Sequence, residues 1–305
     1  MPSESEVFGS AGAKPETNGG APGAAGMLGH GGSDESGGAE SQAGASGVVS
    51  NGSSGSGGKS GSGGSSGSSA AAGKGGSGGS GGFDPEAGLV AHFTFDEPSG
   101  AVVVNAKDST KNAKCVGTCT RPAGQLGLAF GLRNTVSPTD WIQLPSGVFS
   151  GHSAVTLSIW LRDLSTARNE APLFHFSLGT KEAISLTPDD RDTRTSATGA
   201  HLAGVHAGAS FVDLWSAAPL LTDKAWHQVV FSWSAASVEL YIDSKLVGSD
   251  PSPSVLPSQL GATSPNYLGR APDDTSLALF GEIDDLRIYN RVLPAAQVAL
   301  LYKVR

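Results

Sequence analysis

From Phe83 onward, apolar and polar residues alternate in short runs that turn-forming residues separate. In residues 89–95 the odd-numbered positions hold Leu, Ala, Phe and Phe, as expected for a strand with one buried face. Further predicted strands span residues 126–132, 141–144, 155–161, 173–178, 201–206, 210–215, 226–233, 238–242, 246–249, 267–269 and 279–289. So many short strands predict a sandwich or a barrel.

One segment, at the C-terminal end, has a helical pattern. In residues 293–302, Val298, Leu301 and Tyr302 fall on one face, and the proline at position 294 suits the first turn of a helix. The prolines of the strand-rich part, Pro188 among them, lie between predicted strands, where a missing N–H removes no ladder hydrogen bond. The sequence therefore predicts one short helix beside the strands.

The first 82 residues have a different composition. Residues 52–82 are almost pure Gly, Ser and Ala, and such a stretch has too little apolar surface to bury for folding. We predict a disordered Gly/Ser-rich stalk or linker over residues 1–82 and one folded domain over residues 83–305. The alternative is a low-complexity tail without a spacing role.

The charge of the chain excludes two classes of partner. The net charge is −8, of which residues 1–82 contribute a net −3, and Lys and Arg form no cluster. We therefore expect no binding to nucleic acid or to anionic lipid. No stretch reaches the roughly 18 apolar residues of a membrane span. The first residues also lack the basic and apolar regions of a signal peptide, which leaves the export route open.

Two cysteines, Cys115 and Cys119, stand four positions apart, without a second Cys pair or a His run that could complete a zinc site. We predict a local disulfide that pins one loop, with modest stabilisation because the ring is small. Such a bond would indicate an oxidising compartment. Two free thiols in a loop are the alternative.

Four segments carry a family resemblance. They read GLVAHFTFDE at 88–97, VTLSIWL at 155–161, WHQVVF at 226–231 and LFGEIDDLRIYNRVL at 279–293. These segments resemble, in the same order, the motifs of LamG-like jelly-roll domains found in bacterial surface and secreted proteins.

The resemblance implies an all-β fold: a two-sheet antiparallel jelly-roll sandwich of the concanavalin A-like lectin/glucanase kind, with one short C-terminal helix. It also implies an extracellular or cell-surface location. The chain departs from the family pattern at two positions. Ser244 stands where a turn glycine is usual, and Pro294 replaces a helix-capping serine.

The resemblance further suggests a structural calcium ion. In related sandwiches, the acid at the position of Asp284 supplies oxygen ligands to calcium, and Asp96 at the end of the first strand is the second candidate ligand. Asp108 and Asp140 are weaker candidates. The alternative is that the acids at 284 and 285 cap turns or form ion pairs with Arg287 and Arg291.

The same strand allows a comparison with laminarinase-type glucanases, whose Glu-x-Asp-x-x-Glu motif supplies the two catalytic carboxylates. Here Glu282 and Asp284 are present, but Arg287 takes the place of the third acid. A retaining pair cannot be assembled from this strand, so we expect no catalytic residue and no enzyme activity.

Four tryptophans and one histidine of the strand-rich part are candidates for the core or for a site. Trp160, Trp226 and Trp233 lie in predicted strands and are expected in the core. His227 shares the parity of buried positions and is expected to hydrogen-bond rather than react. Trp215, two residues after an aspartate, could pack in the core or face a sugar ring.

These features favour a monomeric, non-enzymatic recognition module that binds a glycan or an extracellular protein, with calcium stabilising its loops. A glycoside hydrolase of the same fold and a structural or adhesive surface protein are the alternatives. No residue in the sequence identifies the ligand.

Overall fold

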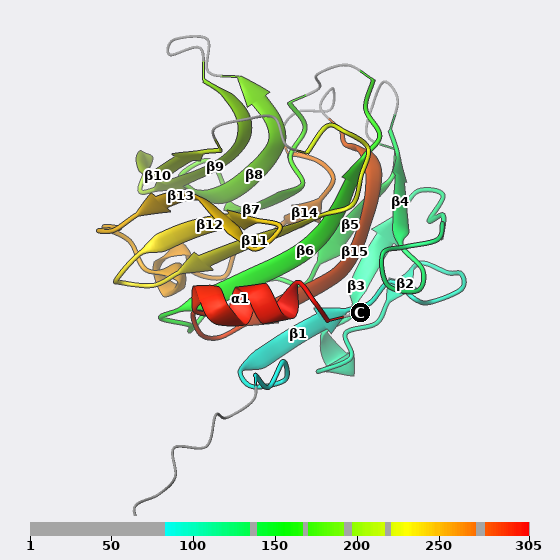
Figure 1. Ribbon diagram of the computed structural model, residues 1–305, viewed down its shortest axis with the longest axis horizontal. Helices are drawn as coiled ribbons and strands as arrows, with labels where there is room; N and C mark the ends of the chain where they lie inside the picture. The colour runs from blue at the N-terminus through cyan, green and yellow to red at the C-terminus, as the bar shows by residue number, and fades with distance from the viewer. Residues whose placement is uncertain are drawn as a thin grey trace, which may run out of the picture. The chain divides into compact units, whose positions relative to one another are not determined.

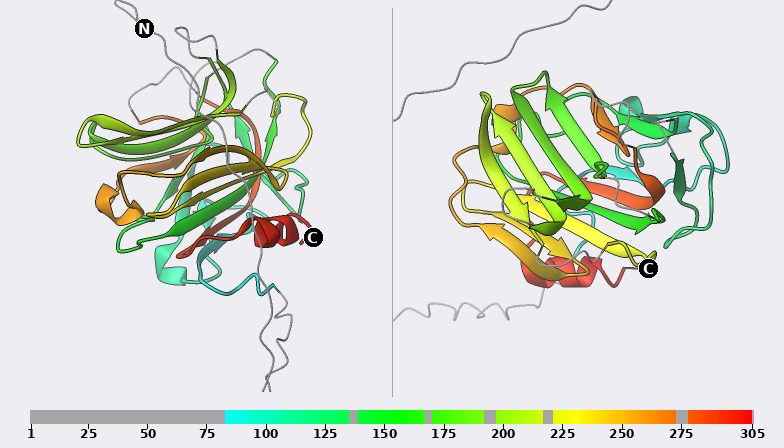
Figure 2. Two further views of the ribbon diagram at one scale, coloured as in Figure 1. Left: turned by 60° about the vertical axis from the view of Figure 1, so that its left-hand side comes forward. Right: turned by 90° about the horizontal axis from the view of Figure 1, so that it is seen from above.

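The computed structural model describes residues 83–134, 139–166, 170–191, 197–216, 221–272 and 278–304. The predicted stalk at 1–82 lies outside these residues. Strands form two antiparallel sheets of seven and eight strands, and one short helix follows near the C-terminus (Figures 1 and 2). The predicted all-β, two-sheet sandwich is thereby confirmed.

The seven-stranded sheet has the order β1-β15-β6-β11-β12-β13, and β4 pairs with β15 beyond this path. The first and last long strands are neighbours, with Phe93 of β1 opposite Leu286 of β15. The strands are β1 (Leu89–Phe93), β4 (Phe130–Arg133), β6 (Val155–Asp163), β11 (His227–Trp233), β12 (Val238–Ile242), β13 (Lys245–Asp250) and β15 (Phe280–Tyr289).

The eight-stranded sheet has the order β10-β9-β8-β7-β14-β5-β3-β2. Its strands are β2 (Val102–Val103), β3 (Ala113–Val116), β5 (Trp141–Leu144), β7 (Phe174–Leu178), β8 (Glu182–Arg191), β9 (Thr198–His206), β10 (Ala209–Trp215) and β14 (Asn266–Leu268). Two 3-10 turns, η1 (Ser109–Lys111) and η2 (Pro257–Leu260), lie in the connections.

The core lies between the sheets, where strand side chains of one parity interdigitate. Phe149 is its centre, because its ring packs edge-on against Phe176, Phe231 and Trp233, with ring centroids 5.4, 5.9 and 6.4 Å apart. The Trp233 indole N–H donates to the Val255 carbonyl at 2.9 Å, so the buried polar atom is satisfied.

Helix α1 (Ala295–Leu301) covers the outer face of the seven-stranded sheet (Figure 1). Val298 and Leu301 are buried there against Val230 and Tyr289, as the helical pattern predicts. Tyr302 stacks on Trp160 with 5.4 Å between ring centroids, so Trp160 is buried although it points away from the main core. We call this surface the helix-covered face. No helix in the described part of the chain is long and apolar enough to cross a membrane.

Strand β8 is missing from the sequence-based prediction, and Pro188 is the reason. It lies inside β8 rather than between strands, at a point where the pairing of β8 with β9 is interrupted between Thr187 and Asp190. The missing N–H therefore removes no ladder hydrogen bond. The short strands β2 and β3 were also missed, since two to four residues show too little periodicity.

One predicted strand needs correction. The strand predicted at 126–132 begins only at Phe130, because the residues before it form the tip of a hairpin. The turn between β12 and β13 keeps both central residues at positive φ, with Asp243 at 50° and Ser244 at 65°, as a two-residue hairpin turn requires even without glycine.

Candidate functional site

A hairpin at residues 120–131 brings the two predicted calcium ligands to one place. Isolated bridges join Thr120 to Gly131 and Ala123 to Leu128, and we call residues 124–128 the tip. The Leu126 N–H donates to Asp284 Oδ2 at 2.7 Å, and the Leu128 N–H donates to Asp96 Oδ1 at 2.8 Å. Asp284 and Asp96, 188 positions apart in the printed sequence, therefore contact the same tip.

Glycine is needed at two tip positions because the carboxylates approach so closely. A Cβ at Gly124 would meet Asp284 Oδ2, and a Cβ at Gly127, where φ is +70°, would meet Asp96 Oδ1. The tip thus forms a cradle of backbone groups around two carboxylates.

Asp284 is buried in an unfavourable electrostatic setting. Burial raises its pKa to about 7, the Leu126 N–H opposes this rise, and the Asp285 and Asp96 carboxylates add to it. Its second oxygen, Oδ1, is buried without a hydrogen-bond partner. A cation beside this oxygen would remove both the repulsion and the missing contact.

The donor set suits a hard cation. Within the described ranges, no three His, Cys, Asp or Glu side chains gather into a metal cluster, so an ion here would need backbone carbonyl oxygens besides the two carboxylates. Calcium accepts such mixed oxygen ligands in a flexible geometry. The two carboxylates, with the unpartnered Asp284 Oδ1, therefore fit calcium, and backbone carbonyl oxygens would have to supply the other ligands.

The neighbouring acids have structural roles. Asp285 pairs with Arg287 at 3.0 Å and with His92 at 2.7 Å. For Asp285, the pair with Arg287 is the ion-pair alternative considered above. Asp108 caps η1 by accepting the Thr110 N–H at 3.0 Å. Asp140 accepts the Thr118 hydroxyl at 2.6 Å, so neither weaker candidate lies at the hairpin tip.

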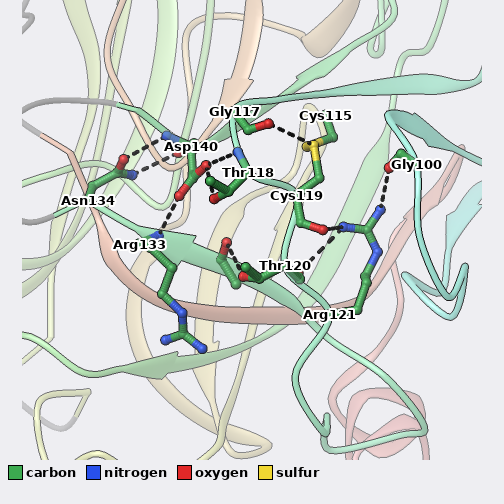
Figure 3. The surroundings of a disulfide bond; sticks show 11 residues. Gly100, Cys115, Gly117, Thr118, Cys119, Thr120, Arg121, Arg133, Asn134 and Asp140 are labelled. Atoms are coloured by element: carbon green, nitrogen blue, oxygen red, sulfur yellow. Dashed lines mark hydrogen bonds between the residues drawn. A yellow bond between two sulfur atoms is a disulfide. The ribbon is translucent and has the colours of Figure 1, made fainter.

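A disulfide joins Cys115 to Cys119, with their Cα atoms 5.9 Å apart (Figure 3). Cys115 is buried in β3, where it pairs with Ile142 of β5. Gly117 lies between the cysteines at φ +106°, and a Cβ there would collide with the Thr139 carbonyl. Gly117, inside the five-residue ring, thus packs closely against the segment before β5.

Glu282 is an ion-pair residue. It is 2% exposed, and its carboxylate contacts Arg133 at 3.0 Å and, on its other oxygen, Arg162. The Arg162 guanidinium in turn lies over the Trp226 ring, 5.2 Å from its centroid, so Trp226 is half-buried at this cluster rather than in the core. Both oxygens of Glu282 are therefore occupied by cations.

The outer face of the eight-stranded sheet carries a second group of candidate residues, which sequence reasoning missed. Tyr267 of β14 lies beside Trp141 of the neighbouring β5, with ring centroids 6.5 Å apart and planes at 77°. The Arg270 guanidinium lies over both rings, at 4.7 Å from Trp141 and 5.2 Å from Tyr267. Only the pairing of β14 with β5 brings positions 141 and 267 together.

Four strands away from Trp141, the same face has another aromatic cluster. His201 of β9 stacks on Trp215 of β10 with centroids 3.9 Å apart. Its Nδ1 contacts Asp190 at 2.6 Å and its Nε2 contacts Asp213 at 2.9 Å, while the Trp215 indole N–H donates to Asp213 at 2.7 Å. Trp215 is half-buried on the outer surface and is not a core residue, whereas Phe211 of the same strand is.

We call this surface the aromatic face. One row across it runs through positions that pair strand by strand, and it includes Tyr267 of the first cluster and Asp213 of the second. The row is Lys114, Gln143, Tyr267, His175, Ser185, Ala203 and Asp213.

His227 hydrogen-bonds as predicted, but at the edge of the core rather than inside it. Its ring lies between Asp243 at 2.7 Å and Asp223 at 2.9 Å. Burial opposes protonation, yet the two carboxylates prevail and raise the pKa of His227. No nucleophile contacts the ring in these hydrogen bonds, so the geometry is that of a fixed ion pair.

The two-sheet jelly roll, its C-terminal helix and its hairpin-bound carboxylates define a lectin-like β-sandwich. The chain belongs to the concanavalin A-like lectin/glucanases superfamily, whose family model matches residues 136–299, more than half of the sequence. No curated protein matches the sequence.

Solved structures share the fold. Domain 4 of AbnA, a GH43 extracellular arabinanase from Geobacillus stearothermophilus solved with arabinotriose, is similar with a TM-score of 0.59 and 23% identity over 71% of this chain and 98% of that domain. The binding domain of botulinum neurotoxin DC is similar in complexes with SialylT, at a TM-score of 0.53, and with rat synaptotagmin II, at 0.54. Identity is 10% in both, over 71% of this chain and 51% of the toxin chain, so this chain spans about half of the toxin binding domain.

Proposed function

We propose that this protein is a non-enzymatic extracellular recognition module that binds carbohydrate on its aromatic face. The observation that carries the proposal is the pair of outward-pointing clusters, Trp141–Tyr267 and His201–Trp215, on one sheet surface. Aromatic rings offer an apolar surface to a sugar ring, while nearby carboxylates, imidazoles and amides bind its hydroxyl groups.

The spacing of the clusters suits an oligosaccharide better than a single sugar. Tyr267 on β14 and His201 on β9 are three strand intervals apart, about 14 Å at the usual distance between neighbouring strands. The positions between them hold His175 and Ser185, which are half-buried and polar. A ligand that crosses the strands would contact both clusters at once.

The comparisons support a recognition role without fixing the ligand. Domain 4 of AbnA was solved with arabinotriose, and the toxin binding domain, of which the match covers 51%, was solved with SialylT and with a protein, synaptotagmin II. Proteins that contain this fold were thus solved with glycans and with a protein. A protein ligand is the second candidate for this chain. Against a hydrolase stand the ion pairs of Glu282 and the arginine at position 287.

A glycan-array screen of the full chain, followed by titration of the best hit, tests the proposal. Trp215→Ala and Tyr267→Ala should each weaken binding at least about tenfold, the equivalent of 1.4 kcal/mol. Trp226→Ala, which removes an aromatic ring outside the aromatic face, is the matched control and should bind normally. Binding that survives both face variants, or release of reducing sugar from the ligand, would contradict the proposal.

We further propose that Asp284 and Asp96 hold a calcium ion together with carbonyl oxygens of the 124–128 tip. When bound, calcium would supply the positive charge that the buried Asp284 carboxylate lacks. A ligand that binds only the folded state stabilises it by RT ln(1 + [L]/Kd), about 2.7 kcal/mol at a hundredfold excess over Kd.

The calcium proposal predicts that the wild type and Asp284→Asn exchange their order of melting temperature between chelator and calcium. At pH 8 in chelator, Asp284→Asn should melt at or above the wild-type temperature, because it removes a buried charge while its amide oxygen can still accept the Leu126 N–H. In calcium, the wild type should melt higher than Asp284→Asn. Magnesium should substitute poorly because it demands a stricter octahedral geometry. A wild-type melting temperature that calcium leaves unchanged would rule the site out.

A further inference from the structure

We infer that the Cys115–Cys119 disulfide is a positioning element of the proposed calcium site, so that calcium affinity and the redox state of the cysteine pair are coupled. The inference rests on the calcium site proposed above. It adds that calcium affinity depends on the disulfide, although neither cysteine is a calcium ligand. The hairpin at 120–131 is the element that connects the two.

The disulfide ends where the hairpin begins. Cys119 directly precedes Thr120, whose carbonyl accepts the Gly131 N–H at 3.0 Å in the first bridge of the hairpin. At the other end of the bond, Cys115 is fixed in β3, where its N–H donates to the Ala101 carbonyl at 2.7 Å. The bond therefore ties the base of the hairpin to a strand of the eight-stranded sheet.

Arg121 connects this base to the loop that carries Asp96. Its guanidinium donates to the Cys119 carbonyl at 3.0 Å and to the Gly100 carbonyl at 3.3 Å (Figure 3). It also lies over the Phe130 ring, 4.9 Å from the centroid, at the return strand of the hairpin. A shift of Cys119 would thus displace both the hairpin and the loop after Asp96.

The tip has little tolerance for such a shift. Gly124 and Gly127 approach the two carboxylates more closely than any side chain allows, and one N–H holds each carboxylate. If the base of the hairpin moves, the tip occupies its binding geometry for a smaller fraction of the time. The apparent affinity for calcium then falls in proportion to that fraction. The contacts of Thr118 with Asp140 remain when the bond is open, so the fold itself is expected to persist.

Opening the bond is a balanced exchange with a dithiol reductant. Two electrons and two protons convert the disulfide to the Cys115 and Cys119 thiols, while the dithiol closes to its own disulfide. Because coupling between two equilibria is reciprocal, calcium must stabilise the Cys115–Cys119 bond by the same factor by which the bond strengthens calcium binding.

Calorimetric titration of calcium into the full chain, after chelator treatment, tests the inference. The disulfide form should bind at least about fivefold more tightly than the dithiothreitol-reduced protein and the Cys115→Ala/Cys119→Ala variant, at the lower end of typical coupling. In a dithiothreitol redox titration of the wild type, saturating calcium should make the disulfide harder to reduce by the same factor, about 20 mV for fivefold.

A matched control separates coupling from general destabilisation. Val238→Ala removes a buried side chain from β12, a strand that does not contact the hairpin in the sheet order, and should keep wild-type calcium affinity. Equal affinity in all cysteine states, no effect of calcium on the redox titration, or a loss in Val238→Ala as large as in the cysteine variant would overturn the inference. Absence of calcium binding to the disulfide form would instead contradict the calcium site itself.

Discussion

The outer faces of the two sheets are built from the same alternating pattern, but their aromatic residues are buried on one face and half-exposed on the other. On the helix-covered face, Trp160 is buried because Tyr302 stacks on it, and α1 buries Tyr289 and Val230. On the aromatic face, Trp141, Tyr267 and Trp215 stay half-exposed. An aromatic residue that points outward from a strand is thus a core residue or a candidate site residue, depending on what the rest of the chain packs over it.

The largest expected effect on stability comes from the packing of α1 on the helix-covered face. Leu301→Ala removes a buried side chain that packs between α1 and the sheet, and should lower the free energy of unfolding by about 2–5 kcal/mol. Chemical denaturation of the full chain measures it. A loss below about 1 kcal/mol would mean that α1 is not docked.

The next effect concerns the ion pairs at the end of the helix-covered face. Glu282→Gln leaves Arg133 and Arg162 without their carboxylate, and should cost about 1–3 kcal/mol. The value is smaller than for a fully buried pair because the two arginine side chains are 35% and 32% exposed. Denaturation curves in low and high salt measure it, and a variant more stable than the wild type would contradict the structural role of Glu282.

On the aromatic face the expected effect on stability is smaller still. Trp215→Ala should lower the free energy of unfolding by no more than about 1 kcal/mol, because the ring packs mainly on His201 at the surface. The same variant should abolish most glycan binding, whereas Leu301→Ala should retain it below its melting temperature. A destabilisation of Trp215→Ala as large as that of Leu301→Ala would make Trp215 a packing residue.

The smallest effect is a pH dependence at His227. Since its pKa is raised in the folded state, its contribution to stability is fully present below the unfolded value of 6.5 and is lost as the pH rises through the folded pKa. The pKa of its partner Asp223 is lowered, first by the Ala225 N–H and then by His227, so that contribution is lost as the pH falls below 3.8.

His227→Gln should therefore flatten the fall in stability as the pH rises above 6.5. The change in the free energy of unfolding should be less than about 1 kcal/mol because the Asp223 side chain is 60% exposed. Melting curves at closely spaced pH values measure the change. An unchanged pH profile in His227→Gln would assign the dependence to other groups.

Much of the fold could be predicted from sequence because each long strand carries its own period-two pattern. Strand β8 also alternates, but it could not be recognised because Pro188 and the two aspartates after it resemble a turn. The bulge there tolerates a residue without an N–H. Asp284 could be singled out as a candidate in advance from the motif around it, whereas the Trp141–Tyr267–Arg270 cluster could not, because its members come from separate segments with no shared local signal.

The sequence by itself determined the strand-rich domain and the helix at its end, since these depend on local spacing and residue type. It also singled out two cysteines by their spacing and two acids by a family resemblance. Tertiary structure decided the rest. Strand order made β1 and β15 neighbours and brought Asp96 and Asp284 to one hairpin tip. It also decided which outward-pointing aromatics a helix covers and which remain available to a ligand, because burial depends on contacts between residues far apart in the chain.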